Sequence, residues 1–478
     1  MAGSDREHAR RPLRWILGVV LVLALVVGGL ATWHYDLLDR WLEDEPQQPA
    51  EPAAIAPPPG LDLPPVDLPE AVARPLPERP RLDRSAVRAA VQSDLSDRDL
   101  GRHVLAAVAP LAGGPPAYTL GSGLAVPAST TKVVTSAAAL YALGADHVFE
   151  TTVVQDGRRR VVLVGGGDPL LASRPDDETA YPPRADVVSL AERTARALRK
   201  KGIRSVRLGY DAGLFTGPAE NPTWEPDYIP DGVVSPIAAL WVDEGRPASG
   251  FGRVADPAAA AAAAFATALG KAGIRVEGAP EGASAPGSTP LAAVSSAPLG
   301  EIVERVLTVS DNEAAEVLLR HVGLAAEGDG SFDGGRRGVR RILESQGIDL
   351  RSSVLYDGSG LSRDNRLDPR VLIDVLRLAM DPEHPELGAV LTGLPVAGFT
   401  GSLADRMDLG PPEGRGRVRA KTGTLTGVTS LAGIAADVDG NAMVFVLMAD
   451  RVRKNRDYFA RVAMDNAAAS LGACRCGL

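Results

Sequence analysis

Three short motifs place nucleophile-type residues in a fixed order along the chain. They are Ser129-Thr130-Thr131-Lys132, Ser310-Asp311-Asn312 and Lys421-Thr422-Gly423. The 478 residues contain only six lysines, and two of these lie in the motifs. A serine hydroxyl becomes a useful nucleophile when a neighbouring base takes its proton, and a neutral lysine amine can be that base. The ordered set therefore indicates serine acyl transfer.

The first motif is predicted to lie on a helix. Residues 129–143 show the helical spacing of apolar positions and are followed by a glycine. Ser129 and Lys132 then share one face of the helix. Burial, and a second ammonium group at Lys421, would favour the neutral form of Lys132. A serine at a helix start is also an ordinary cap, so this pair alone is weak evidence.

The second motif has two interpretations. Ser310-Asp311-Asn312-Glu313 matches a capping box that opens a predicted helix over residues 313–321, after a predicted helix over residues 299–307. In the catalytic interpretation, Ser310 relays a proton to the leaving amine and Asn312 offers its amide to the substrate.

The third motif is predicted to lie on a strand over residues 417–425. The cation of Lys421 and the hydroxyls of Thr422 and Thr424 can hold a substrate carboxylate. Gly423 leaves room for the close approach of a ligand backbone. An ordinary edge strand with an exposed lysine is the alternative. The three motifs in this order, each on a suitable element, favour the catalytic interpretation.

The chain resembles the D-alanyl-D-alanine carboxypeptidase/endopeptidase family of low-molecular-mass penicillin-binding proteins, of the class C type with an insertion between the first and second motifs. Beyond the three motifs, the resemblance rests on residues 164–169, 356–363 and 421–428, and it covers about residues 85–470. It implies that Ser129 is acylated, that Lys132 is its base, and that the substrates are peptidoglycan stem peptides, with β-lactams as covalent inhibitors.

The same resemblance implies how the substrate is held. Ser310 and Asn312 would complete the proton path and bind the substrate amide. Lys421 and Thr422 would bind the terminal carboxylate. The backbone N–H groups of Ser129 and Thr424 would form the oxyanion hole.

The expected fold class is α+β, with a penicillin-binding/β-lactamase-like antiparallel sheet flanked by helices and an inserted smaller α/β domain. We expect the serine peptidase domain to comprise residues 85–150 and 291–478, with residues 151–290 inserted. The insertion is shorter than the family pattern, which indicates that one subdomain is reduced or absent. Its expected elements are a hairpin over 153–164, helices over 185–200 and 258–271, and a strand over 203–210; the chain should end with strands over 430–438 and 442–449 and a helix over 457–471.

The N-terminal part predicts a membrane anchor. Residues 15–33 carry no charge, and at about 1.5 Å per residue they nearly span a hydrocarbon core of roughly 30 Å. Arginines precede this run and acidic residues follow it, so the catalytic part should be extracytoplasmic. We expect residues 1–12 to be cytoplasmic, 13–33 to be a single-pass anchor in the cell membrane, and the proline-rich residues 34–84 to be a linker. A cleaved signal peptide is the alternative.

Composition argues against several other classes. A formal charge of −9 argues against nucleic acid as a partner. Six scattered histidines and two cysteines give no metal-binding pattern, so neither a metal nor a cofactor is expected. A bridge between Cys474 and Cys476 would be strained, and no disulfide is expected to hold the core. Gly165-Gly166-Gly167-Asp168 lacks the spacing of phosphate-binding loops and favours a turn.

Two rival functions share the motifs. A class A β-lactamase needs an additional carboxylate for deacylation, and no Glu-x-x-x-Asn arrangement follows Asn312 to supply it. A slowly recycling, non-catalytic sensor of β-lactams or peptidoglycan is the second rival. The sequence does not separate cleavage of a terminal D-Ala from cleavage of a crosslink, because both leave a D-Ala acyl group on the serine.

Overall fold

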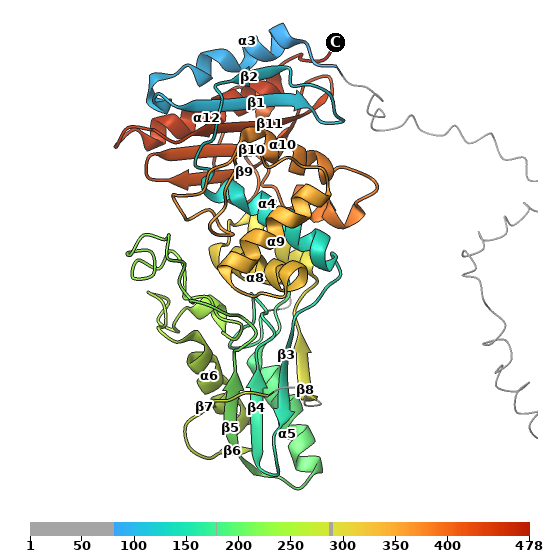
Figure 1. The fold of residues 1–478 in the computed structure, drawn as a ribbon, viewed down its shortest axis with the longest axis vertical. Helices are drawn as coiled ribbons and strands as arrows, with labels where there is room; N and C mark the ends of the chain where they lie inside the picture. The colour runs from blue at the N-terminus through green and yellow to red at the C-terminus, as the bar shows by residue number, and fades with distance from the viewer. Residues whose placement is uncertain (1–80, 178, 286–289) are drawn as a thin grey trace, which may run out of the picture. The chain divides into compact units, whose positions relative to one another are not determined.

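The computed structural model describes residues 81–177, 179–285 and 290–478 (Figure 1). The predicted anchor over residues 13–33 and nearly all of the predicted linker lie outside these ranges. Within the described ranges, no helix has the length and apolar character needed to cross a bilayer.

The motifs are built around a sheet of five strands in the order β2-β1-β11-β10-β9, in which every neighbouring pair is antiparallel (Figure 1). Its strands are β1 (Val104–Pro110), β2 (Tyr118–Leu120), β9 (Val418–Leu425), β10 (Val428–Ala436) and β11 (Ala442–Ala449). In β11, alternate side chains enter two different cores, because successive residues of a strand point to opposite faces. The third motif lies on β9, at the end of this strand order.

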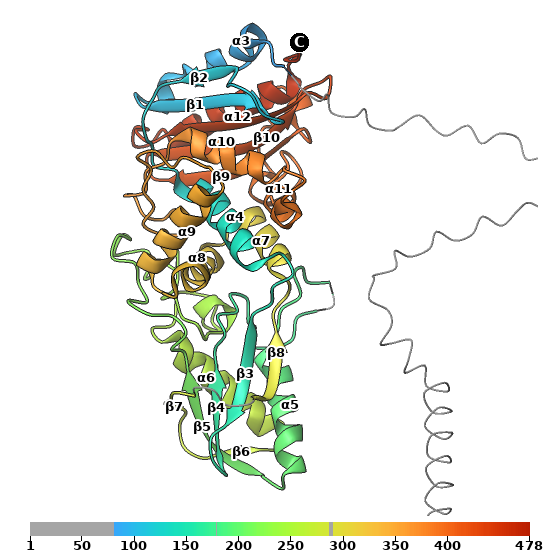
Figure 2. The same ribbon diagram turned by 45° about the vertical axis from the view of Figure 1, so that its right-hand side comes forward.

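Helices cover both faces of this sheet (Figure 2). On one face α3 (Arg84–Leu95) and α12 (Asp457–Ala473) pack against the sheet and each other. The opposite face packs against α4 (Thr131–Leu143) and α10 (Pro369–Leu378). The same core continues through α7 (Leu299–Thr308), α8 (Asn312–Glu327) and α9 (Phe332–Ser345). The first two motifs therefore lie on helices of one shared core.

The chain between the first two motifs forms a second sheet with the path β6-β5-β4-β3-β8, and β7 pairs with β5. Its strands are β3 (Glu150–Gln155), β4 (Arg160–Val164), β5 (Ser205–Asp211), β6 (Arg275–Val276), β7 (Glu281–Gly282) and β8 (Pro290–Ser295). The helices α5 (Val187–Lys200) and α6 (Pro257–Lys271) close its own core. The predicted α+β fold class is confirmed. β8 runs past residue 290, into the part that the sequence assigned to the peptidase domain.

The remaining elements are short. They are α11 (Gly388–Thr392) and the 3-10 turns Arg98–Leu100, Ala128–Thr130, Asp243–Gly245, Pro385–Leu387, Gly401–Leu403 and Pro412–Gly414. Two of these turns, Ala128–Thr130 and Asp243–Gly245, contribute to the site described below.

The predicted capping box at the second motif is wrong. Asp311 caps α8, because its carboxylate accepts a hydrogen bond of 3.0 Å from the backbone N–H of Ala314. Ser310 has a left-handed backbone with φ of 61°, which turns the chain between α7 and α8 and leaves Asp311 in the extended conformation of a cap. In the first motif, Ser129 lies in the 3-10 turn before α4 and does not cap that helix.

The glycines of residues 165–167 serve close packing. A side chain at Gly166 would lie 2.0 Å from the backbone oxygen of Glu150, and one at Gly167 would lie 2.3 Å from Nε2 of His321. The N–H of Gly167 already donates to the backbone oxygen of Ala239 at 2.9 Å. This segment is a packed turn, as the sequence favoured.

A disulfide joins Cys474 and Cys476. Its two cysteines are only two positions apart, so it links no distant elements of the core.

Candidate active site

The turn that carries Ser129 is fixed by two neighbouring segments. A side chain at Gly423 in β9 would lie 2.6 Å from the backbone oxygen of Pro127, and one at Gly360 would lie 1.9 Å from the backbone oxygen of Ala128. Ala128 itself has a φ of 47°, which costs free energy for a residue with a side chain. The close approach expected at Gly423 is therefore made by the protein's own backbone. Ser129 remains half-buried, and Thr130 and Thr131 after it are buried.

The Nζ atom of Lys132 contacts all three parts of the site. It lies 3.1 Å from Oγ of Ser129, 2.8 Å from Oδ1 of Asn312 and 2.8 Å from the backbone oxygen of Ser359. The amide and carbonyl oxygens can only accept hydrogen bonds. A neutral amine would give its two N–H groups to them and keep its lone pair for the Ser129 hydroxyl. The geometry therefore suits proton transfer from Ser129 to Lys132.

The surroundings of Lys132 also favour the neutral amine. Complete burial lowers the pKa of Lys132 to about 8, although the carboxylates of Glu316 and Asp357 act in the opposite direction. Glu316 accepts hydrogen bonds from the backbone N–H groups of Gly358 and Ser359, at 3.0 and 2.8 Å. This carboxylate thus fixes the peptide whose carbonyl group holds Lys132.

The side chain of Asn312 is held from two directions. Its Oδ1 accepts from Lys132, and its Nδ2 donates to the backbone oxygen of Val233 at 3.0 Å. Nδ2 carries a second N–H that a substrate carbonyl can accept. Ser310 is half-buried two residues earlier, and among the described residues its hydroxyl forms no hydrogen bond. The relay role of Ser310 stays a prediction.

The third motif places a second buried lysine near the first. Lys421 is fully buried, and its Nζ donates to the backbone oxygen of Thr422 at 2.8 Å. Burial, and then the charges of Lys132 and Arg406, lower the pKa of Lys421. Two ammonium groups in one buried site are costly, so the pair favours a single proton. A substrate carboxylate at this motif would stabilise that proton on Lys421 and leave Lys132 neutral.

The two hydroxyl groups of the third motif differ in exposure. Oγ1 of Thr422 is 2.9 Å from Oγ of Ser402, and Thr424 is exposed. Thr422 is buried, so only the Thr424 hydroxyl lies at the surface, and the binding of a carboxylate by these two hydroxyls stays a prediction. The oxyanion hole formed by the N–H groups of Ser129 and Thr424 stays a prediction.

The sequence analysis used residues 356–363 only as part of the family resemblance and missed that this loop holds Lys132. Asp357 accepts hydrogen bonds from the backbone N–H groups of Gly360 and Ser362, and from Nε1 of Trp224. This network places the Ser359 carbonyl. The signal was present in the run Asp357-Gly358-Ser359-Gly360, whose small residues and acceptor side chain are typical of a tight turn.

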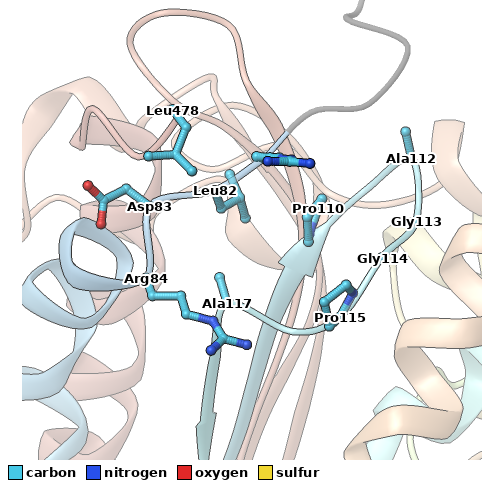
Figure 3. Close-up of a pocket in the computed structure, with 11 residues that line it drawn as sticks. Leu82, Asp83, Arg84, Pro110, Ala112, Gly113, Gly114, Pro115, Ala117 and Leu478 are labelled. Carbon is cyan, nitrogen blue, oxygen red and sulfur yellow. The ribbon is translucent and has the colours of Figure 1, made fainter.

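A cavity of about 800 Å³ lies elsewhere. It is lined by the segment before α3, by the turn between β1 and β2, and by the C-terminal Leu478 (Figure 3). None of the motif residues line it. The volume of a cavity is therefore not sufficient to identify the active site of this protein.

A half-buried serine beside a buried lysine, with an asparagine and a second lysine from other elements, defines a serine acyl-transfer enzyme on a penicillin-binding fold. The chain belongs to the D-Ala-D-Ala carboxypeptidase 3 (S13) family, whose model matches residues 87–251 and 245–471. It is accordingly a serine-type D-Ala-D-Ala carboxypeptidase.

Several characterised proteins are similar to this chain. The carboxypeptidase DacB of Mycolicibacterium smegmatis is 36% identical over 482 residues, which cover 98% of this chain and 100% of that protein. The carboxypeptidase Rv3627c of Mycobacterium tuberculosis is 37% identical over 73% of this chain and 76% of its own length. The crystal structure of penicillin binding protein 4 (dacB) from Haemophilus influenzae has a TM-score of 0.64 at 22% identity, over 80% of this chain and 98% of that chain. This last similarity bears on the fold.

The burial of Lys132 predicts a specific pH dependence. The rate of Ser129 acylation by a penicillin should rise about tenfold per pH unit below the pKa of about 8 and stop rising near that pH, because only the neutral amine accepts the serine proton. Stopped-flow measurement with a fluorescent penicillin checks this. A rate that is constant between about pH 6 and pH 8 would contradict the role of Lys132.

The contact at Gly423 predicts that Gly423→Ala separates β9 from the Ser129 turn. The added methyl group would meet Oγ of Ser430 at 2.1 Å and the backbone oxygen of Pro127 at 2.6 Å. We expect acylation to slow by about 100-fold and the free energy of unfolding to fall by about 1–3 kcal/mol. Gly270→Ala in α6, which has no neighbour within 4 Å, is the matched control and should acylate normally. Normal acylation by the Gly423 variant would show that this contact does not place Ser129.

Proposed function

We propose that this carboxypeptidase acts on peptidoglycan stem peptides outside the cytoplasmic membrane through an acyl-enzyme on Ser129, and that it also cleaves peptide crosslinks. The observation that carries the proposal is the position of the Lys132 amine between Ser129, Asn312 and the Ser359 carbonyl. Endopeptidase activity is proposed because hydrolysis of a crosslink proceeds through the same D-Ala acyl group. β-Lactams are proposed as covalent inhibitors because their ring carbonyl can acylate the same serine.

In the proposed reaction, Oγ of Ser129 attacks the carbonyl carbon of the penultimate D-Ala while Lys132 takes the hydroxyl proton. The peptide C–N bond then breaks, and the leaving amine receives a proton by way of Ser310. Water hydrolyses the ester that remains, with Lys132 again as the base, and regenerates the serine. Asn312 donates to the acyl-side amide, and Lys421 with Thr422 and Thr424 binds the terminal carboxylate.

Support for the carboxylate site comes from charge and burial. A carboxylate that binds beside Lys421 would be paired with a cation in a site shielded from water, where charge-assisted hydrogen bonds are strong. A terminal D-Ala carries this carboxylate, and in a crosslink the equivalent carboxylate would belong to the amino acid that supplies the leaving amine. The same group on both substrates is consistent with one site for both cleavages.

The membrane anchor is part of the proposal. The uncharged residues 15–33 and the change from basic to acidic flanks support a single span with an extracytoplasmic catalytic part. An anchored protein would keep its N-terminal residues, whereas a signal peptide would be removed. The intact mass of the protein extracted from membranes checks this, and a chain that starts after residue 33 would reject the anchor.

The function predicts defined products from defined muropeptides. The wild-type protein should release D-Ala from a monomeric pentapeptide and convert a crosslinked dimer into monomers, and Ser129→Ala should do neither. The reason is that both reactions need the same nucleophile. Liquid chromatography with mass spectrometry identifies the products.

Two outcomes would contradict parts of this function. Release of D-Ala with an intact dimer would reject the endopeptidase activity and retain the carboxypeptidase. Turnover by the Ser129→Ala variant would reject the assigned nucleophile. Ser189→Ala is a suitable control, because this serine is also half-buried but lies on α5 of the inserted chain, away from the three motifs.

A further inference from the structure

The chain inserted between the first two motifs reaches the second motif through a cluster of buried carboxyl groups. Oxygen atoms of Glu244, Asp311 and Glu313 lie within 4.8 Å of one another. Asp311 and Glu313 are the immediate neighbours of Asn312, whereas Glu244 lies in the 3-10 turn Asp243–Gly245, before α6. All three side chains are buried. The position of Asn312 is thus linked to a residue far away in the sequence.

The backbone that presents Glu244 is strained. Asp243, Glu244 and Gly245 have φ values of 51°, 57° and 71°, and the first two are unfavourable for residues with side chains. The surrounding structure imposes this turn. Oγ of Ser235 donates to the backbone oxygen of Glu244 at 2.5 Å, and the N–H of Asp243 donates to the backbone oxygen of Leu171. Strain of this kind is typical of positions that serve a site.

Four arginines face this cluster. Arg246 is 2.6 Å from Glu244, Arg253 is 2.8 Å from Glu313, and Arg305 is 3.4 Å from both Glu244 and Asp311. Arg184 lies close enough to Asp243 and Glu244 to interact electrostatically with their side chains. Arg184, Arg246 and Arg253 come from the inserted chain, whereas Arg305 comes from α7. The guanidinium groups supply the cations that face these carboxyl groups.

The proximity of the Glu244 and Asp311 carboxyl groups favours a single proton on the pair. Two carboxylates in hydrogen-bond contact cannot both ionise at low cost. Burial, and then the charge of Asp311, raise the pKa of Glu244 to about 9. Burial also opposes ionisation of Asp311, but the hydrogen bond from Glu244 and the charge of Arg305 outweigh it and lower the pKa of Asp311. Glu244 is therefore the donor near neutral pH, and Asp311 is the acceptor.

Asp311 connects this hydrogen bond to the catalytic residues. The same carboxylate caps α8 by accepting from the N–H of Ala314. Asn312, the first residue of α8, holds Nζ of Lys132. A shift of Asp311 would therefore move the group that orients the base.

We propose that Glu244 is a positioning residue for the second motif: as a carboxylic acid it donates a hydrogen bond to Asp311, and this bond fixes the start of α8 so that Asn312 holds Lys132. The inference deepens the proposed function and rests on it. When Glu244 ionises, a second negative charge stands beside Asp311, so the two side chains separate and Asn312 is displaced. Glu244 thus sets an alkaline limit on acylation.

The pH profile of acylation tests this role. The fully folded protein and the variants Glu244→Gln and Glu244→Ala are titrated with a fluorescent penicillin, and thermal melting at each pH confirms the fold. In wild type the rate should fall by about tenfold per pH unit above the pKa of Glu244. Glu244→Gln should lose this fall, because its amide donates to Asp311 at every pH. Glu244→Ala should acylate about 10–100-fold more slowly throughout.

A matched control is Asp168→Asn, which removes another buried carboxyl group whose pKa is raised, to about 7, by burial. The acylation rate of this variant should fall at alkaline pH in the same way as that of the wild type. The inference is overturned if Glu244→Gln keeps the wild-type fall, or if a folded Glu244→Ala variant acylates normally. If Glu244→Ala does not fold, the profile of Glu244→Gln decides. Absence of acylation in wild type at every pH would instead reject the proposed function.

Discussion

The Nζ atom of Lys132 is buried between two oxygen atoms that can only accept hydrogen bonds, and much of the described structure serves to keep it there. One oxygen belongs to Asn312 and the other to the backbone of Ser359, which are 180 and 227 positions away in the sequence. A neutral amine donates its two N–H groups to these two acceptors, so its lone pair is left for the third neighbour, the Ser129 hydroxyl. The five-stranded sheet, α4, α8 and the loop at residues 357–360 must therefore assemble together before the serine has a base. Burial destabilises the protonated form of Lys132, and the neutral amine that results can act as a base.

The inserted chain takes part in this assembly. Asn312 donates to the backbone oxygen of Val233, and Trp224 donates to Asp357, the residue that shapes the Ser359 loop. Both contacts run from the inserted chain to groups that hold Lys132. An ionic contact between Arg253 and Glu313 fixes the same region next to α8. The insertion therefore supports the two segments that orient the base, in addition to carrying a separate sheet and core.

The sequence predicted the parts of the site that depend on side-chain type and local spacing. Ser129, Lys132 and Asn312 were found from their motifs, and β9, β10 and β11 followed from alternation and from the turn at Asp439-Gly440, whereas β1 and β2 were not predicted. The Ser359 carbonyl was missed, because a backbone oxygen leaves no residue type to recognise. The capping box at Ser310 failed because the left-handed turn at that residue depends on the packing of α7 against α8. The role of Glu244 could not be predicted for a related reason. Its partner Asp311 lies 67 positions away in the sequence (311 − 244), and no local pattern marks the pair.

The protonation state of Lys132 is the central claim, and it can be measured directly. The chain has only six lysines, so ε-carbon-13 labelling gives a carbon NMR spectrum in which each lysine can be followed as the pH changes. The resonance that disappears in Lys132→Arg identifies the base. The structure predicts that this resonance titrates near pH 8, whereas an ordinary lysine titrates near 10.5. Titration of Lys132 at the ordinary lysine value would contradict the account, because the amine would then be a cation under the conditions in which the serine must lose its proton.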